Sequence, residues 1–355
     1  MKKSLLIILS FAVGVTLFAL AFGQVDWIQI ETAIVLFPKK ALVFVFVINF
    51  LALFMVGSYR WQLILDSQGC PVRFWKMVRA KLAGFAFSYI TPSALIAGEP
   101  IRAYMIKEEG NCGWEKSSAS VILDQMIYLI VLFFTIIFGF IFLAEKFSLP
   151  RDVIYGFWGV FALVALTLYI FYKKTFKRRE GEHAFFTSVI YKIGLARFNY
   201  VKDKLPAIER TEEVIEDFFR KSRSTFAAVV GLAFLDILLN VLAVAVACFY
   251  LGHWLGITES LSIFSFWSLA NLVPIPGALG SSELALSFVF NLLGAGKDVG
   301  LVFSLIFRAI NIVFCILGIL AFLHFAIKTA SRNFSLETPP LLMKIHKRLS
   351  GSKRK

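Results

Sequence analysis

The sequence predicts an all-α integral membrane protein with six transmembrane helices and two re-entrant broken-helix hairpins, arranged as inverted repeats. Three observations support this prediction. Hydrophobic residues make up 59% of the 355 residues, and the mean hydropathy is +0.77. Charged residues make up only 17%, whereas a soluble domain carries about 25%. Apolar runs recur along the chain, and each is long enough to cross a hydrocarbon core of about 30 Å.

Six uninterrupted apolar runs are the predicted full spans, namely residues 5–22, 41–58, 117–143, 153–172, 226–251 and 299–327. The first run follows Lys2 and Lys3 and ends near Ala19 and Ala21, so a cleaved signal peptide is the alternative there. We favour an uncleaved first helix, because this run is long for the apolar part of a signal peptide and long enough to span.

Two further apolar regions, residues 77–106 and 261–293, are interrupted at residues 91–98 and 274–280. Proline removes an amide donor and blocks helix continuation, while glycine allows the chain to turn. Non-helical backbone at membrane depth is tolerated only where protein or a water-filled cavity satisfies it. We therefore interpret each region as a re-entrant hairpin, with these residues forming the breaks: Pro92, Gly98, Pro274, Pro276, Gly277 and Gly280.

Loop charges predict the orientation of the spans. The net charge is +14, and the basic residues gather near residues 1–3, 60–81, 173–224 and 331–355. Cytoplasmic loops retain Lys and Arg, so we expect both termini in the cytoplasm and the protein in the cell (inner) membrane. Each interrupted region must then enter and leave the membrane on one side. This distribution over loops also argues against nucleic acid as a partner.

The predicted organisation is one membrane domain, residues 1–330, followed by a basic cytoplasmic tail, residues 331–355. Within the basic cytoplasmic loop 173–224, the stretch "VKDKLPAIERTEEVIEDFFRKSR" is amphipathic as a helix. We expect this helix to lie on the membrane surface or to pack in a small cytoplasmic layer. A solvated linker helix is the alternative.

Cysteine and histidine give no sign of a metal or cofactor. Cys70, Cys112, Cys248 and Cys315 show no C-x-x-C spacing, and the four histidines are scattered. We therefore expect all four cysteines to be small hydrophobic residues or free thiols, with no disulfide framework, no metal site and no cofactor.

The two breaks repeat each other. "PSALIAGE" (residues 92–99) and "PGALGSSE" (residues 276–283) share Pro, Ala, Leu and Glu at equal offsets, and the offset between the two prolines also relates Asp124 to Arg308. The flanking spans agree, which gives inverted repeats at about 41–143 and 226–327. Inverted repeats with broken helices are typical of transporters, whose substrate site lies near the membrane midplane. Two proline and glycine kinks with coincidental spacing are the alternative.

The candidate site consists of charged residues in or beside these spans, which we expect to line one polar cavity near the midplane and to bind a lipid headgroup: Glu99, Arg102, Asp124, Asp236, Glu283 and Arg308. An isolated charge at that depth costs at least ~2.5 kcal/mol, so such groups should be paired, hydrated or functional. The N-terminus of a half-helix attracts anions, and a carboxylate in its first turn complements the dipole.

Several alternatives concern single residues. Glu283 could act only as a helix cap, and Asp124 and Arg308 could form a structural bridge between the repeats. Arg102, one turn after Glu99, could bind a phosphate bidentately or reach to the cytoplasmic interface. Arg60, beside a tryptophan, is expected to anchor a span at the interface.

Four motifs resemble the membrane domain of the lysylphosphatidylglycerol synthase/flippase family: "YRWQLIL" (residues 59–65), "GEPIRAY" (98–104), "PGALGSSE" (276–283) and "FRAINIV" around Arg308. The resemblance covers about residues 27–327 and implies movement of lipids between leaflets. Two departures matter. Asp124-Gln125 stands where the family often has Glu-Arg, and no soluble aminoacyl-transferase domain is recognised after the last span, so synthase activity is not implied.

The sequence thus predicts a flippase-like transporter and no enzyme activity, because it shows no nucleophile–base arrangement and no phosphate loop. Expected partners are membrane lipids with anionic or zwitterionic headgroups, and a second copy of the chain or a partner enzyme at the basic cytoplasmic face. The alternatives are an accessory subunit or enzyme of lipid or glycolipid synthesis, and a transporter of small solutes. A groove open to the bilayer would favour lipid, and a closed aqueous cavity would favour solute.

Overall fold

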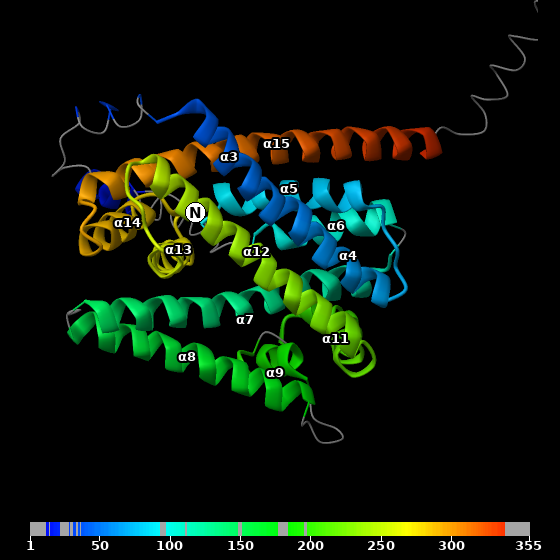
Figure 1. The fold of residues 1–355 in the computed structure, drawn as a ribbon. Coiled ribbons are helices and arrows are strands. Elements are labelled where there is room, and N and C mark those ends of the chain that lie inside the picture. Colours follow the sequence, from blue (N-terminus) through cyan, green and yellow to red (C-terminus); the bar gives the residue numbers. More distant parts are fainter. Residues whose placement is uncertain are drawn as a thin grey trace, which may run out of the picture.

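The computed structural model describes residues 12–13, 15–21, 28, 31–32, 35, 37–92, 97–110, 112–147, 151–176, 184–194 and 197–337. In this part of the chain, all regular elements are helices. Figure 1 shows them as one bundle, with α15 along one side, α7 and α8 along the opposite side, and α12 crossing between them.

Within the described residues, five helices are long and apolar enough to cross a membrane. The first is continuous from α3 (Lys39–Phe50) through a π-helical segment, η1 (Leu51–Val56), into α4 (Gly57–Ser67). The others are α7 (Trp114–Lys146), α8 (Arg151–Phe176), α12 (Arg223–Tyr250) and α15 (Lys297–Glu337). They coincide with five predicted spans, so the protein is a multi-pass membrane protein. Half of the first predicted span, 5–22, and residues 338–355 of the predicted tail lie outside the described residues.

Each interrupted region forms two helices around a break. The first pair is α5 (Phe74–Ile90) and α6 (Glu99–Gly110), and the second is α13 (Ile257–Asn271) and α14 (Ser281–Leu292). The second break contains a single 3-10 turn, η3 (Pro276–Ala278), and two glycines there, Gly277 and Gly280, adopt the left-handed region with φ of 57° and 81°. Figure 1 shows the two pairs toward opposite ends of α15. Their re-entry into a membrane, and the inverted repeat, stay predictions.

Small residues allow the helices of the first pair to approach closely. The amide of Gly98 donates a hydrogen bond to Ser88 Oγ (2.9 Å), and a Cβ atom on Gly98 would overlap the carbonyl of Gly84 on α5. Because the turn that leads into α6 lies against the backbone of α5 there, the side chain of Arg102 on α6 is placed directly against α5 at Gly84.

We expect Gly98→Ala to destabilise the protein by about 1–3 kcal/mol, because the overlapping carbonyl belongs to a helix and has little freedom to move. Gly231→Ala on α12 is the matched control, since no atom lies within 4 Å of a Cβ there. Thermal unfolding of both purified variants in detergent measures the difference. Equal melting temperatures would contradict the close packing of α5 and α6.

The predicted amphipathic helix is α11 (Leu205–Lys221), and its apolar face packs on α7. Its buried Glu212 accepts hydrogen bonds from the backbone amide of Phe186 (2.6 Å) and from the amide and hydroxyl of Thr187, at the start of α9 (Phe185–Lys192). A short helix, α10 (Asn199–Lys202), lies between them in the chain. The helix therefore belongs to a packed layer, and the solvated-linker alternative is wrong.

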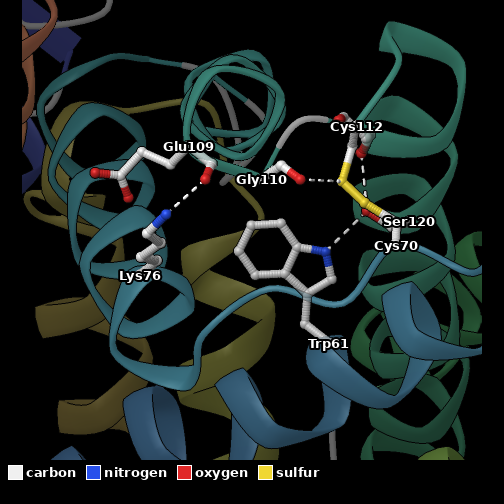
Figure 2. Close-up of a disulfide and its surroundings, with 8 residues drawn as sticks. Trp61, Cys70, Lys76, Glu109, Gly110, Cys112 and Ser120 are labelled. Carbon is white, nitrogen blue, oxygen red and sulfur yellow. Dashed lines mark hydrogen bonds between the residues drawn. A yellow bond between two sulfur atoms is a disulfide. The ribbon is translucent and has the colours of Figure 1, made fainter.

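The expectation that all four cysteines are unpaired is wrong for two of them. Cys70 and Cys112 form a disulfide with their Cα atoms 6.0 Å apart, whereas Cys248 and Cys315 are free and buried. The α5–α6 pair folds back on itself, which brings the loop before α5 next to the loop before α7. Figure 2 shows this bridge beside Trp61. Cysteines 42 residues apart give no local signal of such pairing.

Candidate functional site

The main polar feature of the described interior is a group of six charged side chains, which we call the charge cluster. It draws on α4, α5, α6, α7 and α12, and its members are Arg60, Lys81, Glu99, Arg102, Asp124 and Asp236. Three are cations and three are anions, so the formal charges balance. Four of the six were predicted as site residues from the sequence.

Asp124, in the middle of the cluster, is fully buried and contacts all three cations. Its Oδ1 accepts a hydrogen bond from Arg60 Nε (2.7 Å), and its Oδ2 accepts one from Arg102 Nη2 (2.6 Å) and a longer one from Lys81 Nζ (3.5 Å). Arg60 also donates through Nη1 to Asp236 Oδ2 (3.0 Å). These contacts tie α4 and α6 to the two spanning helices α7 and α12.

Two contacts within single helices follow from helical spacing. Arg102 Nη1 donates to Glu99 Oε2 (2.8 Å), one turn back on α6, and Asn240 Nδ2 donates to Asp236 Oδ1 (3.0 Å) on α12. The guanidinium of Arg102 also lies over the Trp61 ring, 4.2 Å from its centroid. Arg102 is buried, so its alternative interpretation as an interfacial residue is wrong.

Sequence reasoning missed two members of the cluster. Arg60 was expected at the membrane interface, but α4 continues to Ser67, which places Arg60 inside the span and 2% exposed. Lys81 was counted with the basic cytoplasmic segment. Its position within the apolar stretch "KLAGFAF" of α5 was the available signal that it faces the interior.

The other two predicted residues form a second group, the capping cluster, around the second break. Glu283 Oε2 accepts from the amide of Gly280 (2.7 Å), so the Glu283 side chain caps the start of α14. Its Oε1 accepts from Arg308 Nε (2.9 Å), and Arg308 Nη1 donates to the carbonyl of Gly277 (3.1 Å). Ser282 Oγ accepts from Arg308 Nη2 (3.1 Å). Glu283 therefore caps α14 and binds Arg308.

The two clusters lie at different levels of α5. Tyr89 contacts the second break, because a Cβ on Gly277 would lie 3.0 Å from Tyr89 Cζ, and Lys81 belongs to the charge cluster. Eight helical residues separate them, or about 12 Å. Phe85 lies between these levels, with ring centroids 5.7 Å from Phe54 and 6.1 Å from Phe314.

Among the described residues, the recorded hydrogen bonds and ion pairs do not join the two clusters. The alternative of a structural bridge between Asp124 and Arg308 is wrong, since each has other partners. That all six predicted residues line one cavity stays a prediction.

A groove of about 440 Å³ lies between α7, α8 and α13, and we call it the apolar groove. The residues that line it include Leu132, Ile136, Phe140, Phe157, Leu269 and Leu272. Two of the rings that line it are stacked, with the Phe140 and Phe157 centroids 3.5 Å apart. Leu269 directly precedes Ala270 and Leu272 lies two residues after it, and the Ala270 carbonyl accepts a hydrogen bond from Ser281 Oγ (3.1 Å), so the lining of the groove comes close to the capping cluster.

These features define a multi-pass membrane protein with internal polar sites. The protein combines spanning helices with two interrupted helix pairs, and each of these pairs carries buried charges. The family model of the lysylphosphatidylglycerol synthase TM region matches residues 7–318, so the chain belongs to this family. A UPF0104 membrane protein of Pyrococcus horikoshii is 22% identical over 319 residues, covering 88% of this chain and 93% of the relative. One of Methanothermobacter thermautotrophicus is 22% identical over 268 residues, covering 74% and 77%. The predicted family is confirmed.

Proposed function

We propose that this protein moves a lipid with an anionic or zwitterionic, phosphate-bearing headgroup between the two leaflets of the membrane, without covalent chemistry. The observation that carries the proposal is the charge cluster, which lies on spanning helices and on the first interrupted pair. The family relation supports it, because the resemblance in the sequence implies lipid movement.

A purely structural role is a weak explanation for six ionisable side chains in the bundle. Burying ion pairs costs desolvation energy that their attraction often fails to recover, and apolar residues of similar size would stabilise the bundle as well. Intramembrane charges are rare and commonly mark substrate or ion paths. The cluster therefore favours passage of a polar group.

The apolar groove favours a lipid over a small solute as the substrate. A lipid needs an apolar surface for its chains next to a polar site for its headgroup. Two residues that line the apolar groove, Leu269 and Leu272, lie one residue before and two residues after Ala270, whose carbonyl accepts a hydrogen bond from Ser281 beside the capping cluster. A solute transporter has no use for that juxtaposition.

The proposal includes a membrane arrangement. With both termini in the cytoplasm of the cell membrane, the α5–α6 and α13–α14 pairs would be re-entrant and would open from opposite sides. The bridge between Cys70 and Cys112 would then face the cytoplasm, a compartment that normally keeps thiols reduced. Each pair would then present charged side chains to one leaflet, as alternating access between inverted repeats requires.

A leaflet-resolved lipid assay in proteoliposomes tests the proposal. We expect Glu99→Gln to slow movement of the preferred lipid about tenfold or more, because one charge-assisted hydrogen bond to Arg102 (2.8 Å) is weakened in a low-dielectric site. Glu99 is 18% exposed, so folding should tolerate the change. Glu108→Gln on the same helix, at 32% exposed, is the matched control and should transport normally.

The substrates should span phospholipids, an aminoacyl phospholipid and a polyprenyl phosphate. Movement of one of them above protein-free vesicles supports the proposal. An unchanged leaflet distribution for all of them, with folded protein in the vesicles, would refute it and leave the solute transporter and the accessory subunit as candidates.

A further inference from the structure

Lys81 is the least satisfied cation of the charge cluster. An ammonium group has three N–H donors, and among the described residues its recorded hydrogen bond is the 3.5 Å contact to Asp124 Oδ2. The side chain is 14% exposed, compared with 3% for Arg60 and 4% for Arg102. A nearly buried ammonium with one long contact has unused donor capacity and retains access from outside the cluster.

A second donor beside Lys81 is also unused. Arg102 donates through Nη1 to Glu99 and through Nη2 to Asp124, but its Nε–H is buried and has no acceptor among the described residues. Arg102 Nη2 and Lys81 Nζ contact the same oxygen, Asp124 Oδ2, so the two cations are neighbours. An unpaired buried N–H costs about 1–3 kcal/mol, which an added acceptor would recover.

The backbone leaves room for the Lys81 ammonium. A Cβ atom on Gly57 would overlap Lys81 Nζ and lie 3.0 Å from its Cε. Gly57 directly follows the π-helical segment Leu51–Val56, and such segments occur frequently at functional sites. This glycine therefore keeps the Lys81 side chain beside Asp124.

The arginine of the capping cluster lacks this spare capacity. Each of the three nitrogens of Arg308 has an acceptor, on Glu283, Gly277 or Ser282. Arg60 is held by two carboxylates, those of Asp124 and Asp236. Of the charged groups described, the pair Lys81 and Arg102 is therefore best placed to accept a ligand.

We propose that Lys81 Nζ and Arg102 Nε form a binding site for one oxyanion of a phosphate group, with Gly57 as the residue that makes space for the Lys81 side chain. This site specifies how the proposed function would bind its substrate. It rests on that function in one respect, namely that the phosphate belongs to a lipid headgroup. Asp124 Oδ2 competes with the ligand for the Lys81 ammonium, and the ligand displaces Lys81 from it, because that 3.5 Å contact is the longest in the cluster.

Binding to the purified protein in detergent tests the site, measured by isothermal titration calorimetry. The probes are dioctanoyl phosphatidylglycerol, inorganic phosphate and, as the phosphate-free control, dioctanoylglycerol. We expect Lys81→Met to weaken binding of the phospholipid about tenfold or more, because a charged hydrogen bond is lost. Gly57→Ala should weaken it too, by displacing the Lys81 ammonium.

Matched controls separate these effects from general damage. Lys107→Met on α6 removes a partly exposed cation, and Gly231→Ala adds a methyl group where a helix has open space. Both should bind as the unaltered protein does. If the Lys81→Met protein does not fold, the same binding measurement is made with the Lys81→Arg and Gly57→Ala proteins instead.

The outcomes distinguish the site from the proposed function. Binding of inorganic phosphate alone, sensitive to Lys81, supports the oxyanion site and identifies free phosphate as its ligand. Phosphate-dependent binding without lipid movement supports the site and overturns the function. Equal binding by Lys81→Met and the unaltered protein, or equal binding of dioctanoylglycerol, overturns the site even if lipid movement is observed.

Discussion

Asp124→Asn is expected to destabilise the protein by about 3–5 kcal/mol, the range for breaking a buried charge pair from one side. Asp124 is fully buried and is the shared acceptor of Arg60, Arg102 and Lys81. Asparagine has similar shape, but it is neutral and has one acceptor oxygen, so two guanidinium groups would lose an anionic partner. We expect a low yield of folded protein and a strongly lowered melting temperature in detergent.

The control for this prediction is Asp217→Asn, which removes a 56% exposed carboxylate paired with Lys221 on α11. Exposed pairs contribute little, so the melting temperature should stay within error. A double variant, Arg60→Gln with Asp124→Asn, should be more stable than the sum of its single changes predicts, because it removes both charges of a contacting pair. If the Asp124→Asn protein is as stable as the Asp217→Asn protein, the buried ion pairs described for Asp124 are contradicted.

Glu283→Ala is expected to destabilise the protein by about 3 kcal/mol. The change removes the cap at Gly280, for which about 1 kcal/mol is typical. It also removes the anionic partner of Arg308, and hydrogen bonds to charged groups contribute about 1.5–3 kcal/mol. Thermal unfolding measures the sum, and limited proteolysis at the second break should accelerate because α14 loses its start.

The neighbouring helix of the same pair supplies the control. Glu259 pairs with the half-exposed Lys146 (2.6 Å), and Glu259→Gln should cost at most about 1 kcal/mol. Adding Arg308→Gln to Glu283→Gln should recover part of the stability lost in Glu283→Gln, since no unpaired charge then remains. A Glu283→Ala protein with unchanged melting temperature would contradict the capping cluster.

Contacts within one helix could be predicted from the sequence, because helix geometry fixes them. Glu99 and Arg102 are three residues apart, Asp236 and Asn240 are four apart, and each pair is in contact. The cap of Glu283 follows from its place in the first turn after a glycine break. Spans were predicted for the same reason, since length and hydropathy are local properties.

Contacts between helices could not be predicted, because they depend on how helices cross. Arg60 reaches Asp124 and Asp236 only because α4 continues past the apolar run and passes between α7 and α12. The pairing of Cys70 with Cys112 depends on the folding back of α5 and α6. The approximate repeat related Asp124 to Arg308 by sequence, but it carried no information about which charges would touch.

The disulfide between Cys70 and Cys112 also fixes the path that tension takes through the molecule. When the chain is pulled from both ends, load passes from α4 through the sulfur–sulfur bond into α7, and the enclosed segment, whose ends are 42 residues apart in sequence, carries none of it. An extended chain spans about 3.3–3.6 Å per residue. While the bond is intact, roughly 140–150 Å of contour length therefore cannot be extended by the pull. The hairpin that bears Lys81 and Arg102 then experiences no direct load.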